Sequence, residues 1–198
     1  MAKNNPESSG GSLRIVAGTL RGSRLAVPDV TGLRPTSDRV RETLFNWLAP
    51  IIVGARCLDL YAGTGALGIE ALSRGAASCV FVERDRGLCE LLRQNLGRLR
   101  VDGALVVNDD AQGFVAAPEP KEPFDLVFLD PPFAANLWTA AAQRLEQGVW
   151  LRAGAHIYVE TAASAIFDAP ASWGLQREGR AGAVRFALYR RIAHDPLS

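Results

Sequence analysis

Short apolar runs alternate with helical patterns through most of this chain. The apolar runs fall at residues 57–61, 79–82, 104–107, 124–129 and 157–159. Helices are expected between them, and residues 86–100 illustrate the pattern, because leucines recur there on one face of a helix. Such alternation predicts an α/β fold, in which a mainly parallel sheet carries helices on both faces.

The two ends of the chain follow a different pattern. Residues 13–17 and 24–27 alternate on either side of a glycine turn, as the strands of a hairpin do. Residues 37–48 then place apolar side chains at helical spacing. Near the C-terminus, residues 173–178 and 184–189 predict a second antiparallel pair. We therefore expect a small hairpin and helix in front of the sheet.

These patterns divide the chain into four parts. Residues 1–12 are polar and predict a disordered tail, residues 13–50 form the extension, residues 51–192 form the main domain, and residues 193–198 form a second tail. The start lacks the apolar segment of a signal peptide, and no apolar stretch is long enough to cross a bilayer. A cytoplasmic protein without a membrane partner is expected.

The most informative sequence is Asp130-Pro131-Pro132-Phe133, directly after the apolar run 124–129. The prolines end the strand because they donate no ladder hydrogen bond. A carboxylate, free carbonyls and a ring are thus presented at the carboxyl end of a strand, where open α/β sheets bind ligands. They suit a flat molecule with an NH2 group: Asp130 and the Pro131 carbonyl accept its hydrogens, and Phe133 stacks on its ring.

A glycine-rich turn follows the first strand of the alternating region. Gly63, Gly65 and Gly68 match G-x-G-x-x-G, which lets a nucleotide approach the backbone but is shared by many nucleotide binders. Asp59, which ends the strand before the turn, would repel a dinucleotide pyrophosphate and attract a cationic group. NAD therefore fits this turn poorly.

Acidic residues also follow the next two strands. Glu83 lies about 20 residues past the turn, where an acid binds ribose, and Asp110 is placed to accept from an adenine amino group. Each acid alone is better explained as a helix cap or a solvated strand end, but their common register favours S-adenosyl-L-methionine. The candidate cofactor-binding residues are Asp59, Tyr61, Ala62, Gly63, Gly65, Gly68, Glu83, Arg84, Asp110 and Ala111.

Cysteine and histidine usage argues against a metal. Cys57, Cys79 and Cys89 are odd in number and lack metal-ligand spacing, so we expect them to be small buried hydrophobic residues. His156 and His194 lie far apart in sequence, which disfavours a zinc site and a histidine-activated nucleophile.

Charge matters here through its distribution. The net charge is only +1, yet arginines cluster before residue 47 and again near the C-terminus. Arginine suits bidentate contact with phosphate. For any single arginine, an ion pair with a nearby acid is an equal alternative.

Four segments together resemble one family. They are Arg14 to Gly18, Gly32 to Leu48, Asp59 to Gly75 and Asp130 to Phe133. The chain resembles class I S-adenosylmethionine-dependent methyltransferases, and closely the RsmD-type 16S rRNA (guanine-N2) methyltransferases. The segment from Arg34 to Leu48 is the most specific of the four.

The resemblance implies a Rossmann-like seven-stranded mixed sheet with the last strand antiparallel, and an N-terminal extension that grips RNA. It implies methylation of N2 of guanine 966 in 16S rRNA, within a 30S subunit or assembly intermediate, with release of S-adenosyl-L-homocysteine; separately, we expect a monomer. The target base would leave its stack to reach Asp130. The RNA-binding candidates are Arg14, Arg21, Arg24, Arg34, Thr36, Arg39 and Arg41.

Other functions stay open at this point. A similar tetrad serves methylation of adenine N6 in DNA and of glutamine N5 in proteins, and another rRNA guanine is a further alternative. A non-catalytic or NAD-binding domain is a further alternative, which Asp130, Phe133 and Asp59 argue against. Whether Asp130 takes a proton or only accepts a hydrogen bond is also open.

Overall fold

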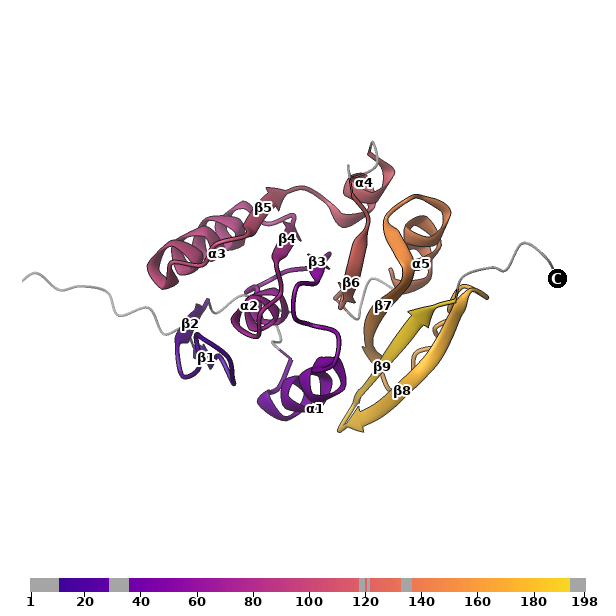
Figure 1. Cartoon of the computed structure of the whole chain (residues 1–198), viewed down its shortest axis with the longest axis horizontal. Coiled ribbons are helices and arrows are strands. Elements are labelled where there is room, and N and C mark those ends of the chain that lie inside the picture. The colour runs from indigo at the N-terminus through magenta and orange to yellow at the C-terminus, as the bar shows by residue number, and fades with distance from the viewer. Residues whose placement is uncertain (1–10, 29–35, 118–119, 121, 133–136, 193–198) are drawn as a thin grey trace, which may run out of the picture.

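The architecture is a seven-stranded sheet with helices on both faces and a separate two-stranded hairpin near the N-terminus (Figure 1). This computed structural model describes residues 11–28, 36–117, 120, 122–132 and 137–192. The hairpin consists of β1 (Gly11–Arg14) and β2 (Arg24–Val27). The helices are α1 (Asp38–Leu48), α2 (Ala66–Ser73), α3 (Arg86–Leu99), α4 (Ala111–Ala116) and α5 (Trp138–Gln147).

The large sheet is mixed, with the strand order β5-β4-β3-β6-β7-β9-β8. Its strands are β3 (Arg56–Asp59), β4 (Ser78–Glu83), β5 (Ala104–Asn108), β6 (Phe124–Leu129), β7 (Leu151–Ala162), β8 (Trp173–Ala181) and β9 (Val184–Arg191). Neighbours among β3 to β7 pair in parallel, whereas β9 pairs antiparallel with β7 and with β8. The expected seven-stranded sheet with an antiparallel last strand is confirmed.

Strand β6 explains why the central apolar runs are nearly continuous. Its side chains alternate, so Leu126 and Phe128 join one buried cluster while Val127 and Leu129 join another on the opposite face. Helices α1, α2 and α3 contribute to the first cluster, and α4 and α5 to the second. Full burial of each such side chain contributes roughly 1.5–3 kcal/mol, and it fixes the register that sets the carboxyl ends of the strands.

The N-terminal extension shares a core with the main domain. Leu13 and Leu25 of the hairpin and Leu44 of α1 lie in the same buried cluster as Ile69 of α2. The packing therefore shows no boundary after residue 50, and the division into two domains there stays a prediction.

Some element boundaries differ from the sequence-based expectation. Gly11 and Ser12 pair with Val27 and Ala26, so they are strand residues and not part of the expected tail 1–12; residues 1–10 and 193–198 lie outside the described residues. β7 is much longer than the expected 157–159. The sequence pattern marked only part of it, because only the second half of the strand is buried on both faces. Cys57, Cys79 and Cys89 are buried, as expected.

The described residues contain neither a membrane-spanning helix nor a cluster of metal ligands. No helix there combines the length and apolar character that a membrane span needs. No group of three or more His, Cys, Asp or Glu side chains in those ranges is arranged to hold a metal ion.

Candidate active site

Acidic side chains follow one another along the carboxyl edge of the parallel strands. Asp59 ends β3, Glu83 ends β4, Asp130 directly follows β6, and Glu160 lies near the end of β7. The register pairs Asp59 with Phe128, and Leu129 with Val159, so Asp130 and Glu160 come next on adjacent strands. The parallel sheet therefore gathers acids from four strands at the edge where such sheets bind ligands.

The glycine turn is fixed by its neighbours on this edge. Gly63 and Gly65 adopt positive φ, 51° and 76°, which suits glycine. A Cβ on Gly65 would lie 2.4 Å from Leu92 Cδ1, and one on Gly68 would lie 2.2 Å from Phe81 Cε1. The predicted G-x-G-x-x-G turn is thus required by close packing as well as by conformation.

Two carboxylates receive backbone hydrogens of this turn. The Gly63 N–H donates to Glu83 Oε2 at 2.9 Å, and the Gly68 N–H donates to Asp59 Oδ2 at 3.0 Å. Glu83 Oε1 also accepts from the Asp85 N–H at 2.8 Å. The structure therefore brings Asp59, Glu83 and the glycines together, as the cofactor hypothesis requires, and it holds the turn in place through the acids.

Asp59 is deeply buried, with 2% of its surface exposed. Burial and the nearby Glu83 charge raise the pKa of its carboxyl, and the hydrogen bond from the Gly68 N–H lowers it, with a net pKa of about 7. A cation beside the carboxyl would favour its charged form.

Asp110, the third acid proposed for the cofactor site, has a different set of partners. Asp110 caps α4, because its Oδ2 accepts from the N–H groups of Gln112 and Gly113 at 3.0 and 3.3 Å. This is the alternative role named for it from the sequence, and its place in a cofactor site stays a prediction. Tyr61 contacts the same helix, since Gln112 Nε2 donates to the Tyr61 hydroxyl at 3.2 Å. Ala62 and Ala111 are buried, and Arg84 is exposed.

Asp130 stands at the end of β6, partly exposed, with Pro131 buried and Pro132 exposed behind it. Phe133 lies outside the described residues. Burial raises the pKa of the Asp130 carboxyl well above its usual range, and the charges of Glu160 and Asp59 raise it further. The Thr36 hydroxyl lies 3.3 Å from Asp130 Oδ2 and lowers that pKa.

Glu160 is a site residue that the sequence analysis missed. It is 5% exposed, and its Oε2 accepts from the Tyr158 hydroxyl at 2.7 Å and from Thr36 Oγ1 at 3.1 Å. The signal was available, because Glu160 follows the apolar run 157–159 as the other acids follow theirs. Thr36, taken from the sequence as an RNA contact, is instead a buried partner of Asp130 and Glu160.

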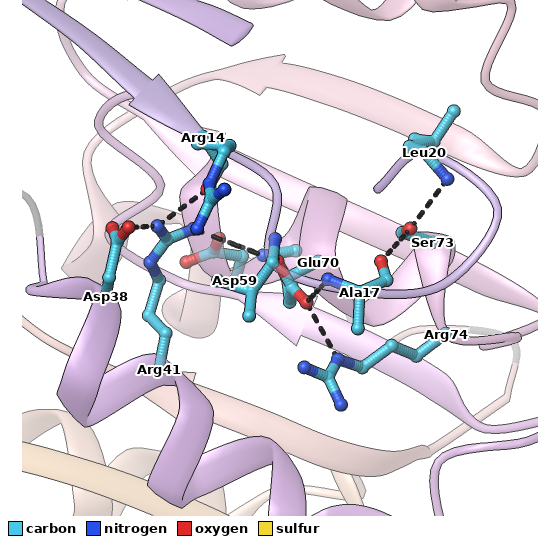
Figure 2. A network of polar contacts seen from close by, with 11 residues as sticks. Arg14, Ala17, Leu20, Asp38, Arg41, Asp59, Glu70, Ser73 and Arg74 are labelled. Atoms are coloured by element: carbon cyan, nitrogen blue, oxygen red, sulfur yellow. Dashed lines mark hydrogen bonds and ion pairs between the residues drawn. The ribbon is translucent and has the colours of Figure 1, made fainter. Parts of the chain in front are cut away.

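Arg41 does not reach a phosphate, contrary to the sequence-based expectation. Its side chain is 0% exposed and lies beneath the hairpin (Figure 2). Nη2 donates to Asp38 Oδ1 at 2.6 Å and to the Arg14 carbonyl at 2.8 Å, and Nη1 lies 3.8 Å from Glu70 Oε2. Its helical position placed it on the buried face of α1, so it is an internal ion-pair residue.

Glu70 ties the hairpin to α2, the helix that follows the glycine turn (Figure 2). Its carboxylate accepts from the N–H groups of Val16 and Ala17 at 2.8 and 3.0 Å and from Arg74 Nε at 2.7 Å. Ser73 adds a bond to the same segment by donating to the Ala17 carbonyl at 2.6 Å. The hairpin loop and the cofactor turn therefore share one helix as their support.

The remaining RNA candidates differ in position. Arg14, Arg21 and Arg24 are exposed on or beside the hairpin, and Arg39 is exposed on α1. Arg34 lies outside the described residues. Their contact with RNA stays a prediction.

Comparisons with known proteins identify the family of this chain. The family model described as Conserved hypothetical protein 95 matches residues 13–190. Ribosomal RNA small subunit methyltransferase D of Escherichia coli K12 is 49% identical over 194 residues, covering 98% of this chain and 96% of its own. A solved structure, the putative methyltransferase yhhF from Escherichia coli, has a TM-score of 0.85 at 46% identity, covering 93% of this chain and 100% of its own.

A more distant structure shares the fold. It is an RNA methyltransferase from Salinibacter ruber in complex with S-adenosyl-L-homocysteine, with a TM-score of 0.62 at 18% identity, covering 83% of this chain and 98% of its own.

Proposed function

The chain belongs to the family described as Conserved hypothetical protein 95, and we propose that it transfers a methyl group from S-adenosyl-L-methionine to N2 of a guanine in 16S rRNA. One observation carries the proposal: Asp130 and its prolines stand on the same sheet edge as Asp59 and the glycine turn. Methylation of an amine needs a site that holds the amine next to a site that holds a positively charged methyl donor. The name of the similar Escherichia coli protein supports ribosomal RNA of the small subunit as substrate.

The residues present fit this cofactor. It supplies a methyl group already activated on a positively charged sulfur. The acids Asp59 and Glu83 lie against the turn, where a negatively charged pyrophosphate would be repelled. Gly65 and Gly68 leave no room for a Cβ, so the turn keeps the close packing that the site requires. The expected product is S-adenosyl-L-homocysteine.

Asp130 and Pro131 would hold the amine. A guanine N2 is a weak nucleophile because its lone pair is delocalised into the ring. If Asp130 and the Pro131 carbonyl each accept one amine hydrogen, the nitrogen is oriented and its lone pair is freed for attack. Such positioning supplies much of a rate enhancement. Phe133 would stack on the base and contribute about 1–3 kcal/mol.

The finer assignments rest on the resemblance. They are guanine 966 as the target, a 30S subunit or assembly intermediate as the substrate particle, and a monomer as the working form. A ribosomal RNA substrate would place the activity in the cytoplasm. The base would have to leave its stack, because Asp130 is only partly exposed where it follows the carboxyl end of β6.

A labelling assay tests the proposal directly. The protein is incubated with S-adenosyl-L-methionine tritiated on the methyl group and 30S subunits from a strain that lacks this methylation. We expect label in 16S rRNA, recovered by nucleoside mass spectrometry as N2-methylguanosine at one position. Double-stranded DNA and ribosomal protein from the same cells are the parallel substrates. Label in either of these, with none in the RNA, would show that the acceptor has been misassigned.

The exposed arginines of the hairpin give a second prediction. Arg21→Ala should weaken binding to 16S rRNA and reduce the slope of log affinity against log salt by about one, as expected for one lost phosphate contact. Arg177→Ala is the matched control, because Arg177 is also exposed but lies on β8, away from the hairpin (Figure 1). Filter binding at several salt concentrations measures both. Equal slopes for Arg21→Ala and the wild type would remove Arg21 from the RNA interface.

A further inference from the structure

A chain of oxygen atoms joins the carboxyl groups of Asp130 and Glu160. Thr36 Oγ1 lies 3.3 Å from Asp130 Oδ2 and 3.1 Å from Glu160 Oε2, and the Tyr158 hydroxyl donates to Glu160 Oε2 at 2.7 Å. Thr36 and Glu160 are 6% and 5% exposed. The chain thus runs from the partly exposed Asp130 into the interior.

The number of hydroxyl hydrogens decides which oxygen donates and which accepts in each of these hydrogen bonds. Thr36 has one hydroxyl hydrogen, and its shorter contact is with Glu160. Glu160 Oε2 then accepts from two hydroxyl groups, which favours its ionised form. The contact between Thr36 and Asp130 is satisfied only if Asp130 carries a proton and donates it to Thr36 Oγ1. All three hydrogen bonds therefore form when Asp130 is protonated and Glu160 is ionised, so that the two carboxyl groups share one proton.

The electrostatics agree with this order of ionisation. Burial raises the pKa of Glu160, but the hydroxyl groups of Tyr158 and Thr36 lower it. The pKa of Asp130 is raised well above its usual range by burial, then by the charge of Glu160, then by that of Asp59. The titratable groups that face the pair are Tyr158 on β7 and Asp59 on β3.

We propose that Glu160 acts through Thr36 and Asp130 as the final acceptor of the proton that the methylated amine releases. Glu160 does not touch the substrate, so it is a positioning residue that works through Asp130. The inference rests on the proposed amine methylation and adds to it the destination of the proton.

The step balances as follows. The amine lone pair forms the N–C bond while the C–S bond of the cofactor breaks and leaves its electron pair on sulfur. The nitrogen, now positively charged, gives one proton to the free oxygen Oδ1 of Asp130. Asp130 Oδ2 gives its proton to Thr36 Oγ1, and Thr36 gives its own to Glu160 Oε2. Asp130 ends neutral, as it began, and Glu160 changes from carboxylate to carboxylic acid.

Two variants test the pathway by rate. Glu160→Gln removes the acceptor and Thr36→Val removes the bridge, and each should lower the single-turnover rate of methyl transfer roughly 100-fold, the lower range for acid–base catalysis. The affinities for cofactor and RNA should stay within a few-fold. The matched controls are Glu90→Gln and Thr43→Val, at exposed or half-exposed helix positions outside the site. A Thr36→Val enzyme with the wild-type rate would overturn the proposal.

A titration without substrate separates this inference from the proposed function. In protein with ¹³C-labelled carboxyl groups, Glu160→Gln should lower the pKa of Asp130, because a repelling charge is lost. Thr36→Val should raise the pKa of Glu160, because a hydrogen bond to its ionised form is lost. If Thr36 served only as packing, its replacement by valine, which has a similar shape, would leave the pKa of Glu160 unchanged. An absent shift in either variant refutes the coupling even if RNA is methylated, whereas both shifts without RNA methylation refute only the proposed function.

Discussion

Asp130→Ala is expected to lower the rate of methyl transfer by about 10³-fold or more while cofactor affinity stays within a few-fold of the wild type. The carboxyl group is both an acceptor for the amine and the outer end of the oxygen chain to Glu160. The cofactor turn is held by other acids, Asp59 and Glu83, so its geometry does not depend on Asp130. Single-turnover kinetics and calorimetric titration with S-adenosyl-L-methionine measure the two effects separately.

Asp102→Ala is the control for that experiment, because Asp102 is an exposed residue in the turn before β5. It should leave both quantities unchanged. A large loss of cofactor affinity in Asp130→Ala would mean that Asp130 belongs to the cofactor site. A retained rate would remove it from the chemistry.

Glu70→Ala is expected to lower the free energy of unfolding by about 3–5 kcal/mol, the usual result of removing one partner from a buried ion pair. The change leaves the guanidinium of Arg41 buried beside Asp38 alone and deprives the Val16 and Ala17 N–H groups of their acceptor. Urea denaturation followed by circular dichroism gives the value.

Glu90→Ala supplies a matched comparison for this stability change. Glu90 also pairs with an arginine one helical turn away, Arg86, but both side chains are largely exposed. Such surface pairs contribute less than about 1 kcal/mol. If both variants lost the same stability, the network around Glu70 would not be what holds the hairpin in place.

The sequence predicted those features that depend on neighbouring residues. β6 has the expected bounds, since an uninterrupted apolar run followed by two prolines marks it. The acids at strand ends were placed together correctly, because parallel strands that start in register also end in register. The helix expected from residue 37 begins there, because the Ser37 side chain caps α1 by accepting from the Val40 N–H.

What the sequence did not predict depends on partners far along the chain. Arg41 was taken for a phosphate contact although Asp38, its nearest ion-pair partner, lies only three positions earlier; its burial beside Glu70, on another helix 29 positions later, has no local signature. Thr36 was misassigned for the same reason, since its partner Glu160 is separated from it by 124 residues. The first half of β7 was not predicted because Arg152 and Ala153 are exposed and Gly154 and His156 are half-buried, so this half has neither a continuous apolar run nor a strict alternation.

The shared core of the hairpin, α1 and α2 has a consequence for the use of this protein as a building block. A fragment that starts after residue 50 would leave Ile69 and the buried face of α2 uncovered and would strand the carboxylate of Glu70 without Arg41. The methyl-transfer domain is therefore not portable without its first 50 residues. RNA recognition should therefore be altered by substituting exposed side chains such as Arg21, and not by truncating or replacing the N-terminal segment.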